Sequence, residues 1–306
     1  MAMVEMMMAM IFLAMVGLGS ARVIATQQSR QNEFMVAAES LQPKAEIMKT
    51  DNNEVPSENQ KLMTMKPNMK IFKTEEKLAS RLVEHVAALS EEYSTRKGTF
   101  TIALSGANLI RNLRNLRSEP HVRSVDWSTW HVFFADEGVQ TKMNGGNYET
   151  ANDVLLSKVP IPESQIHPIN GSLDAKKAAG DYHRILKQLI VKGMLDVSPT
   201  TMAPRFDLML LETGGDGHLA ALFPGHKLLN ETLCVASLDD APTPPRSRVT
   251  FTFPVIDAAA NLVIADLGAP EAAAAAQSKA KGSLDSLRPA KMVKLESGEF
   301  TQYLVR

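Results

Sequence analysis

The sequence predicts an α/β fold in which a mostly parallel sheet is covered by helices on both faces. Two observations predict this class: apolar runs alternate with segments of helical periodicity, and three of these runs end in polar or glycine-containing turns. The three turns are Ser105-Gly106, Asp136–Gly138 and Gly214–His218. Ligands of such sheets bind outside the carboxyl ends of the strands, so the turns predict a single site.

The first elements of the folded body are two helices and two strands. Apolar residues recur at helical spacing in Thr74–Tyr93 and in Ala107–Leu116, which predicts a helix in each segment. Between them, the β-rich run Thr99–Leu104 predicts a strand. The apolar run Trp130–Ala135 predicts a second, buried strand.

The middle of the chain contains its most informative stretch. Helices are predicted at Tyr148–Val159 and Asp174–Leu195. A buried strand at Phe206–Leu211 then leads through a glycine-rich turn into Leu219–Phe223, where we expect a helix to begin. A strand, a turn and a helix N-terminus form a pocket that favours anions, because backbone N–H groups and the helix dipole point at the same place.

The C-terminal part continues the alternation. Strands are predicted at Arg248–Phe253 and Asn261–Asp266, and helices at Pro254–Ala260 and at the alanine-rich segment Glu271–Lys279. A closing pair of strands is predicted at Met292–Leu295 and Tyr303–Val305.

Residues 1–66 differ from the folded body, which we expect to span 67–306. Met6–Ala21 is uncharged and apolar, but it is shorter than the ~20 residues of a membrane span, so no stable membrane insertion of the body is expected. It is similar to a signal-peptide core, although Glu5 and no Lys or Arg precede it. Gln27–Lys66 is polar and predicts a flexible linker. We expect a cytoplasmic protein; the alternatives are organellar or secretory targeting by this leader, or a gene-model extension.

Bulk composition argues against several classes of function. The net charge is −1, which implies no basic face for nucleic acid. The single cysteine, Cys234, excludes an internal disulfide and a cysteine-based zinc site, and its apolar neighbours indicate a packed thiol. The histidines show no metal-ligand spacing, so we expect neither a metal nor another cofactor.

His218 is the candidate general base, because histidine takes and returns protons near neutrality. Asp216, two residues earlier, would either orient the imidazole or cap the helix expected after the turn. Glycines in the two turns are expected to leave backbone N–H groups facing substrate oxygens: Gly106, Gly214, Gly215 and Gly217.

Several motifs occur in an order that resembles one known family. They are FTIALSG at Phe100–Gly106, WHVFFADE at Trp130–Glu137, Asn147-Tyr148, the DGH and LFPG elements of Phe206–Gly225, and Arg248–Thr250. Together they resemble the 6-phosphogluconolactonase family, whose members hydrolyse the δ-lactone of 6-phosphogluconate in the pentose phosphate pathway. The resemblance implies a ribose-5-phosphate isomerase/deaminase-like fold. Related isomerases and deaminases typically continue from DGH toward Asn-Glu-Pro-Gly, so the LFPG ending favours a lactonase.

The resemblance also implies roles for site residues. His218 would remove a proton from water and later pass it to the ring oxygen, and the partner would be a small sugar-phosphate lactone. For Asp136 and Glu137, binding of sugar hydroxyls and a structural role both remain open. The implied substrate-binding residues are Ser105, Gly106, Asp136, Glu137, Asn147, Gly214, Gly215, Gly217 and Arg248.

The chain departs from the family pattern at several positions, and the resemblance implies that the arginine and the lysine of that pattern bind phosphate. Gly138 stands where the family has an arginine, Glu271 where it has a lysine, Glu212 where it has a glycine, and Ala107-Asn108 where it has Gly-Ser or Gly-Thr. Each charge-assisted hydrogen bond to phosphate contributes ~1.5–3 kcal/mol. Losing two predicts a kcat/KM lower by roughly two to four orders of magnitude.

Three cations are candidates to compensate for this loss: Lys142, Arg111 and Arg248. The sequence therefore predicts a 6-phosphogluconolactonase of reduced efficiency. The alternatives are a catalytically impaired, sugar-phosphate-binding pseudoenzyme and a hydrolase of a different lactone.

Overall fold

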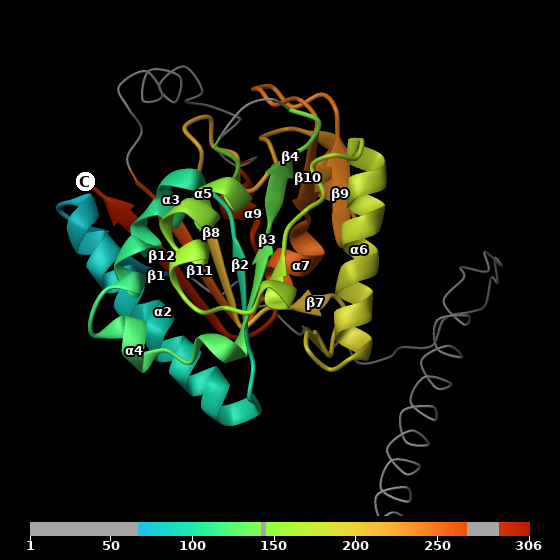
Figure 1. The fold of residues 1–306 in the computed structure, drawn as a ribbon. Helices are drawn as coiled ribbons and strands as arrows, with labels where there is room; N and C mark the ends of the chain where they lie inside the picture. Colours follow the sequence, from blue (N-terminus) through green and yellow to red (C-terminus); the bar gives the residue numbers. More distant parts are fainter. Residues whose placement is uncertain (1–66, 142–144, 268–287) are drawn as a thin grey trace, which may run out of the picture. The chain divides into compact units, whose positions relative to one another are not determined.

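The computed structural model describes residues 67–141, 145–267 and 288–306 (Figure 1). Within these ranges, seven parallel strands form one sheet in the order β1-β12-β11-β8-β2-β3-β5. This sheet confirms the predicted α/β class. The strands are β1 (Asn68–Phe72), β2 (Phe100–Leu104), β3 (Trp130–Phe134), β5 (Ile166–His167), β8 (Leu208–Glu212), β11 (Asn261–Asp266) and β12 (Glu299–Val305).

Helices lie on both sides of this sheet. Figure 1 shows α2 and α3 on one side and α6 and α7 on the other. No helix in the described part of the chain has the length and apolarity needed to cross a bilayer. The α-helices are α2 (Glu75–Lys97), α3 (Ala107–Arg111), α4 (His121–Ser124), α5 (Asn147–Val154), α6 (Ala175–Val191), α7 (Phe253–Ala258) and α9 (Pro289–Met292). Short 3₁₀ helices lie at Asn112–Arg117, Trp127–Thr129, Leu156–Lys158, Glu163–Gln165 and Lys227–Asn230.

The long helix α2 shows how local sequence sets an element. The side chain of Thr74 accepts the N–H of Lys77 at 3.3 Å and caps the first turn. Gly98, at φ +74°, ends the helix in the left-handed conformation that glycine adopts without strain. The apolar stripe that contains Leu78 and Leu82 is fully buried, as the helical periodicity predicts.

A second, antiparallel sheet lies beside the first. Its strands are β4 (Asp136–Gly138), β10 (Arg248–Phe251) and β9 (Val235–Leu238), in the order β4-β10-β9, and α6 packs against β9 and β10. The N–H of Phe251 donates to the carbonyl of Ala135 at 2.6 Å, which fixes β10 to the end of β3. A short pair, β6 (Asp196–Val197) and β7 (Pro204–Arg205), completes the strands.

The predicted meeting of three strand ends occurs at one edge of the main sheet, but the turn predicted at Asp136–Gly138 is wrong, because this segment forms β4 and pairs with β10. Leu104 of β2 pairs with Phe134 of β3 and with Leu210 of β8, so these strands end side by side. The polar segments that follow them, two turns and β4, therefore come together at the carboxyl edge, as expected for ligand sites in parallel sheets.

The helix predicted to begin at Leu219–Phe223 is wrong. Leu219 and Leu222 exchange both backbone hydrogen bonds, at 3.0 and 2.9 Å, in a tight turn with Ala220 at φ +52°. The N–H of Ala221 donates to Oγ1 of Thr250 at 3.1 Å. These donors are satisfied inside the turn and by β10, so the turn after β8 offers no helix dipole to an anion.

Two predictions at the C-terminus need correction or extension, and one strand at the N-terminal end of the described chain was missed. Residues Met292–Leu295 do not form a strand: Met292 ends the short helix α9, and 293–295 have no regular secondary structure. The predicted strand at Tyr303–Val305 is part of the longer β12. The sequence analysis did not predict β1, because this segment has only five residues and Lys70 interrupts its apolar residues. The predicted helix Glu271–Lys279 and residues 1–66 lie outside the described residues, and the domain boundary at 66/67 stays a prediction.

Candidate active site

A cavity of about 410 Å³ opens where β2, β3 and β8 end. The described residues around it include all but two of the predicted site residues; Asp216 and Gly217 support the turn without lining the cavity. Among the described residues, no three His, Cys, Asp or Glu side chains are grouped as a metal site. The predicted residues that line the cavity are Ser105, Gly106, Asp136, Glu137, Asn147, Gly214, Gly215, His218 and Arg248.

His218 and Asp216 form a hydrogen-bonded pair at this cavity. Oδ1 of Asp216 accepts both the backbone N–H of His218, at 3.1 Å, and the proton of Nδ1. Burial raises the pKa of Asp216, but the hydrogen bonds from His218 outweigh it and hold the pKa below its usual value. An ionised carboxylate only accepts, so Nδ1 carries the proton and Nε2 keeps the lone pair of a base.

This contact supports the orienting role of Asp216. Its alternative role as a helix cap is wrong, because a tight turn follows the motif. The imidazole of His218 also packs against the ring of Phe223, with centroids 5.0 Å apart. The ring is therefore held by one polar and one apolar contact.

Three of the four backbone N–H groups predicted to face substrate donate hydrogen bonds within the protein. Gly214 donates to the carbonyl of His218 at 2.9 Å, and Gly217 donates to the carbonyl of Gly214 at 2.8 Å. Gly106 donates to Oδ1 of Asn147 at 3.1 Å. For these three glycines the prediction is wrong. Gly106 and Gly217 have φ values of +94° and +89°, so glycine is needed there for backbone conformation.

Gly214 is required for a different reason. A Cβ at this position would lie 2.1 Å from Cε1 and 2.3 Å from Nδ1 of His218. The imidazole therefore lies directly over the Gly214 backbone, and a side chain there would displace the candidate base.

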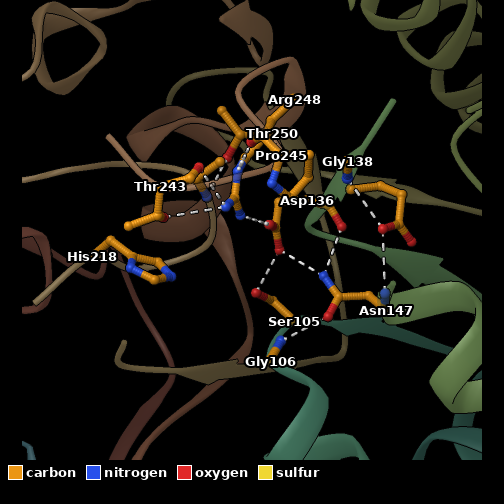
Figure 2. Close-up of polar contacts among 12 residues, drawn as sticks. Ser105, Gly106, Asp136, Gly138, Asn147, His218, Thr243, Pro245, Arg248 and Thr250 are labelled. Carbon is orange, nitrogen blue, oxygen red and sulfur yellow. Dashed lines mark hydrogen bonds and ion pairs between the residues drawn. The ribbon is translucent and has the colours of Figure 1, made fainter. Parts of the chain in front are cut away.

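Asp136 is the centre of a hydrogen-bond network in the cavity wall (Figure 2). Its Oδ1 accepts Oγ–H of Ser105 at 2.6 Å and Nδ2–H of Asn147 at 2.8 Å. Its Oδ2 lies 3.9 Å from a guanidinium nitrogen of Arg248. In Figure 2 the imidazole of His218 points toward this network from the side opposite Asn147. Of the two roles left open for Asp136, these contacts support the structural one.

Glu137 closes the wall beside this network. Its carboxylate accepts the N–H groups of Gly138, Asn147 and Tyr148, at 3.1, 3.3 and 2.9 Å, and so binds the start of α5. Burial raises the pKa of Glu137 to about 7, against the lowering effect of these hydrogen bonds. Glu137 therefore exchanges a proton close to neutral pH.

Arg248 supplies the positively charged side chain among the described residues that line the cavity. Its Nε donates to the carbonyl of Pro245 at 2.8 Å, and one terminal nitrogen donates to the carbonyls of Thr243 and Pro244 at 3.3 and 3.2 Å. The guanidinium also lies 5.6 Å from the ring centroid of Phe223. These contacts hold the cation in one orientation.

Of the other two proposed compensating cations, only Arg111 lies among the described residues. Arg111 donates to Oδ1 of Asn108 at 2.9 Å and does not line the cavity. Lys142, like Glu271, lies outside the described residues.

Glu212 is a site residue that sequence reasoning did not assign. Its carboxylate lines the cavity and accepts the N–H groups of Asn108 and Leu109, both at 3.1 Å, and Nδ2–H of Asn108 at 2.9 Å. The sequence shows that Glu212 stands where the family has a glycine, but it does not show that the side chain points into the cavity.

Comparisons with known proteins agree with this architecture. The family model described as glucosamine-6-phosphate isomerases/6-phosphogluconolactonase matches residues 73–302. A rice protein (Oryza sativa subsp. indica) named probable 6-phosphogluconolactonase 4, chloroplastic, is 46% identical over 236 residues, which cover 76% of this chain and 73% of that protein. The Arabidopsis thaliana protein named 6-phosphogluconolactonase 3, chloroplastic, is 46% identical over 218 residues, covering 70% and 67%.

Among solved structures, the fold is similar to that of 6-phosphogluconolactonase from Trypanosoma brucei. The TM-score is 0.63 at 22% identity, over 78% of this chain and 96% of that one. At this identity the likeness concerns the fold alone.

Proposed function

This chain belongs to the family of glucosamine-6-phosphate isomerases and 6-phosphogluconolactonases, and from that premise we propose that it hydrolyses 6-phospho-D-glucono-1,5-lactone to 6-phosphogluconate. This reaction is the second step of the oxidative branch of the pentose phosphate pathway. The relatives at 46% identity are named for this activity. The observation that carries the proposal is the His218–Asp216 pair at the mouth of a cavity large enough for a small ligand.

The proposed reaction uses His218 as general base and then as general acid. Nε2 takes a proton from water, and the resulting nucleophile attacks the lactone carbonyl carbon. The tetrahedral intermediate collapses with cleavage of the bond to the ring oxygen, which receives the proton from Nε2. Such proton transfer typically contributes about 10²–10⁴-fold to the rate.

Asp216 is a positioning residue in this scheme. Its carboxylate keeps the proton on Nδ1 and stabilises the imidazolium that forms when Nε2 is protonated. Since Gly214 and Gly217 use their N–H groups within the turn, the negative charge that develops on the carbonyl oxygen is stabilised elsewhere in the cavity. Arg248 is the described cation available for this role.

The test is lactone hydrolysis by the purified protein above the spontaneous rate. His218→Ala is expected to abolish the enzymatic rate. His226→Ala is the matched control, because His226 pairs with Asp240 outside the cavity. A wild-type rate no greater than that of His218→Ala would refute the proposal.

One observation favours the alternative of an impaired, sugar-phosphate-binding protein. The described cavity lining contains three carboxylates, from Asp136, Glu137 and Glu212, against the single guanidinium of Arg248. Binding of 6-phosphogluconate without turnover of the lactone would support this alternative over the enzyme.

We propose in addition that residues 1–66 target the domain at 67–306 to an organelle. The names of the two plant relatives include the word chloroplastic, which supports this alternative over the cytoplasmic expectation. Fusion of residues 1–66 to a fluorescent protein tests it: diffuse cytoplasmic fluorescence in plant cells would contradict the proposal.

A further inference from the structure

The carboxylate of Glu212 closes one end of the cavity. Glu212 is the last residue of β8, and its side chain extends to the first turn of α3. Three donors converge on it: the N–H groups of Asn108 and Leu109 and the side-chain amide of Asn108. Arg111 donates in turn to Oδ1 of Asn108, which directs the Asn108 amide nitrogen toward Glu212. The carboxylate is therefore fixed by a satisfied set of hydrogen bonds.

No space is left beneath this carboxylate. A Cβ at Gly106 would lie 2.1 Å from Cβ and 2.6 Å from Oε2 of Glu212, so the side chain lies directly against the Gly106 backbone. The donors that would bind an anion at the start of α3 are already occupied by an anion of the protein itself.

The surrounding charges act in the same direction. Asp136 also lines the cavity, and Arg248 lies 3.9 Å from its carboxylate and donates to three carbonyl groups. A phosphate brought to the α3 end would meet the fixed charge of Glu212 in a partly desolvated site, where like charges repel more strongly than in water.

We infer that Glu212 is a specificity-determining residue, whose carboxylate excludes phosphate from the α3 end of the cavity and leaves that end to uncharged hydroxyl groups. The inference rests on the proposed function, since it concerns which gluconolactone the same site prefers. It implies that the protein discriminates only weakly between 6-phosphoglucono-1,5-lactone and unphosphorylated glucono-1,5-lactone.

The experiment compares kcat and KM for the two lactones in the full-length wild type and in Glu212→Gln. The variant is nearly isosteric and removes one negative charge. We expect its KM for the phosphorylated lactone to fall about tenfold, because one charged interaction contributes a free energy of about this size. We expect kcat to stay within about twofold of wild type. The KM for the unphosphorylated lactone is expected to stay unchanged.

Glu84→Gln is the matched control. It removes the same charge from an exposed position on α2 that does not line the cavity, and should change neither KM. Equal changes for both lactones in Glu212→Gln, or no change for either, would overturn the inference.

A binding measurement separates this inference from the proposed function. Calorimetric affinities for 6-phosphogluconate and gluconate need no turnover, so they remain informative if neither lactone is hydrolysed. Tighter binding of 6-phosphogluconate alone by Glu212→Gln supports the role of Glu212. Glu212→Gly, which frees the N–H groups of Asn108 and Leu109, serves as a second variant if Glu212→Gln does not fold. Unchanged affinity in the folded variant would contradict the role.

Discussion

Gly138 and Arg248 lie directly opposite each other across the antiparallel pair of β4 and β10. Pro245, three residues before Arg248, covers the Gly138 backbone: a Cβ at Gly138 would lie 2.4 Å from Cγ of Pro245. The same proline offers its carbonyl to Nε of Arg248 at 2.8 Å. The missing arginine at position 138 and the orientation of Arg248 are therefore linked through one loop.

This relationship predicts that Gly138→Arg alone will not restore phosphate binding. The new side chain would collide with Pro245, at a cost of about 1–3 kcal/mol for an overpacked site. The double variant Gly138→Arg/Pro245→Ala removes the colliding Cγ and is expected to bind 6-phosphogluconate about 10–100-fold more tightly than wild type. Isothermal titration calorimetry measures both affinities.

Pro245→Ala alone is the control for this pair of changes. It opens the loop without adding a cation and should leave the affinity within about threefold of wild type. If Gly138→Arg alone gained as much affinity as the double variant, the contact with Pro245 would not be the obstacle.

The second prediction concerns Asp216. Asp216→Asn keeps the shape of the side chain but removes the charge that holds the proton on Nδ1 of His218. We expect kcat for lactone hydrolysis to fall by about 10²–10⁴-fold, with a smaller change in KM. Asp240→Asn is the control, because Asp240 forms a hydrogen bond with the imidazole of His226, through Nε2, outside the cavity. Similar losses in both variants would show a general effect on folding.

The parallel sheet and the position of the site follow from local patterns. The buried strands at Trp130–Ala135 and Phe206–Leu211 are mostly apolar runs, each with one polar residue, His131 and Asp207, and each is followed by a polar segment. Since strand ends in a parallel sheet meet at one edge, the grouping of the three turns was predictable without coordinates. The His218–Asp216 contact was also predictable as one of two alternatives, because only Gly217 separates the two residues in the turn.

The remaining features depend on partners distant in sequence. Leu219–Phe223 has a helix-like composition, but its tight turn is fixed by Thr250 on β10. Glu212 takes its role from Asn108, which lies on another element. The use of the Gly106 N–H depends on Asn147, again outside any local window. Such contacts override local propensity and cannot be derived from one segment.

The third prediction concerns pH and Glu137. Its pKa is raised from 4.5 to about 7 in the folded protein, so the folded state binds more protons than the unfolded state between these values. The stabilising effect of protonated Glu137 is thus present below pH 4.5 and is lost as pH rises through 7. Relative to Glu137→Gln, wild type is expected to lose up to ~3 kcal/mol of unfolding free energy between pH 4.5 and 8. Urea denaturation across this range measures the difference, and a constant difference would contradict the assignment.

The last prediction concerns Gly214. In Gly214→Ala the new methyl group would lie 2.1 Å from Cε1 of the His218 imidazole, so the ring must rotate away from Asp216 or the turn must shift. Misplacing a catalytic group by about 1 Å costs roughly 10²-fold in rate, and we expect a kcat loss of this order in a protein that still folds. Gly180→Ala on α6 is the matched control: nothing lies within 4 Å of its Cβ, and helix propensity favours alanine by about 0.5–1 kcal/mol. Thermal unfolding measures the change in stability and kcat measures the change in catalysis, so the two measurements separate these effects. Full activity in Gly214→Ala would show that the position of the imidazole over Gly214 does not matter for the reaction, and would leave only the contact with Asp216 as a geometric argument for His218 as the base.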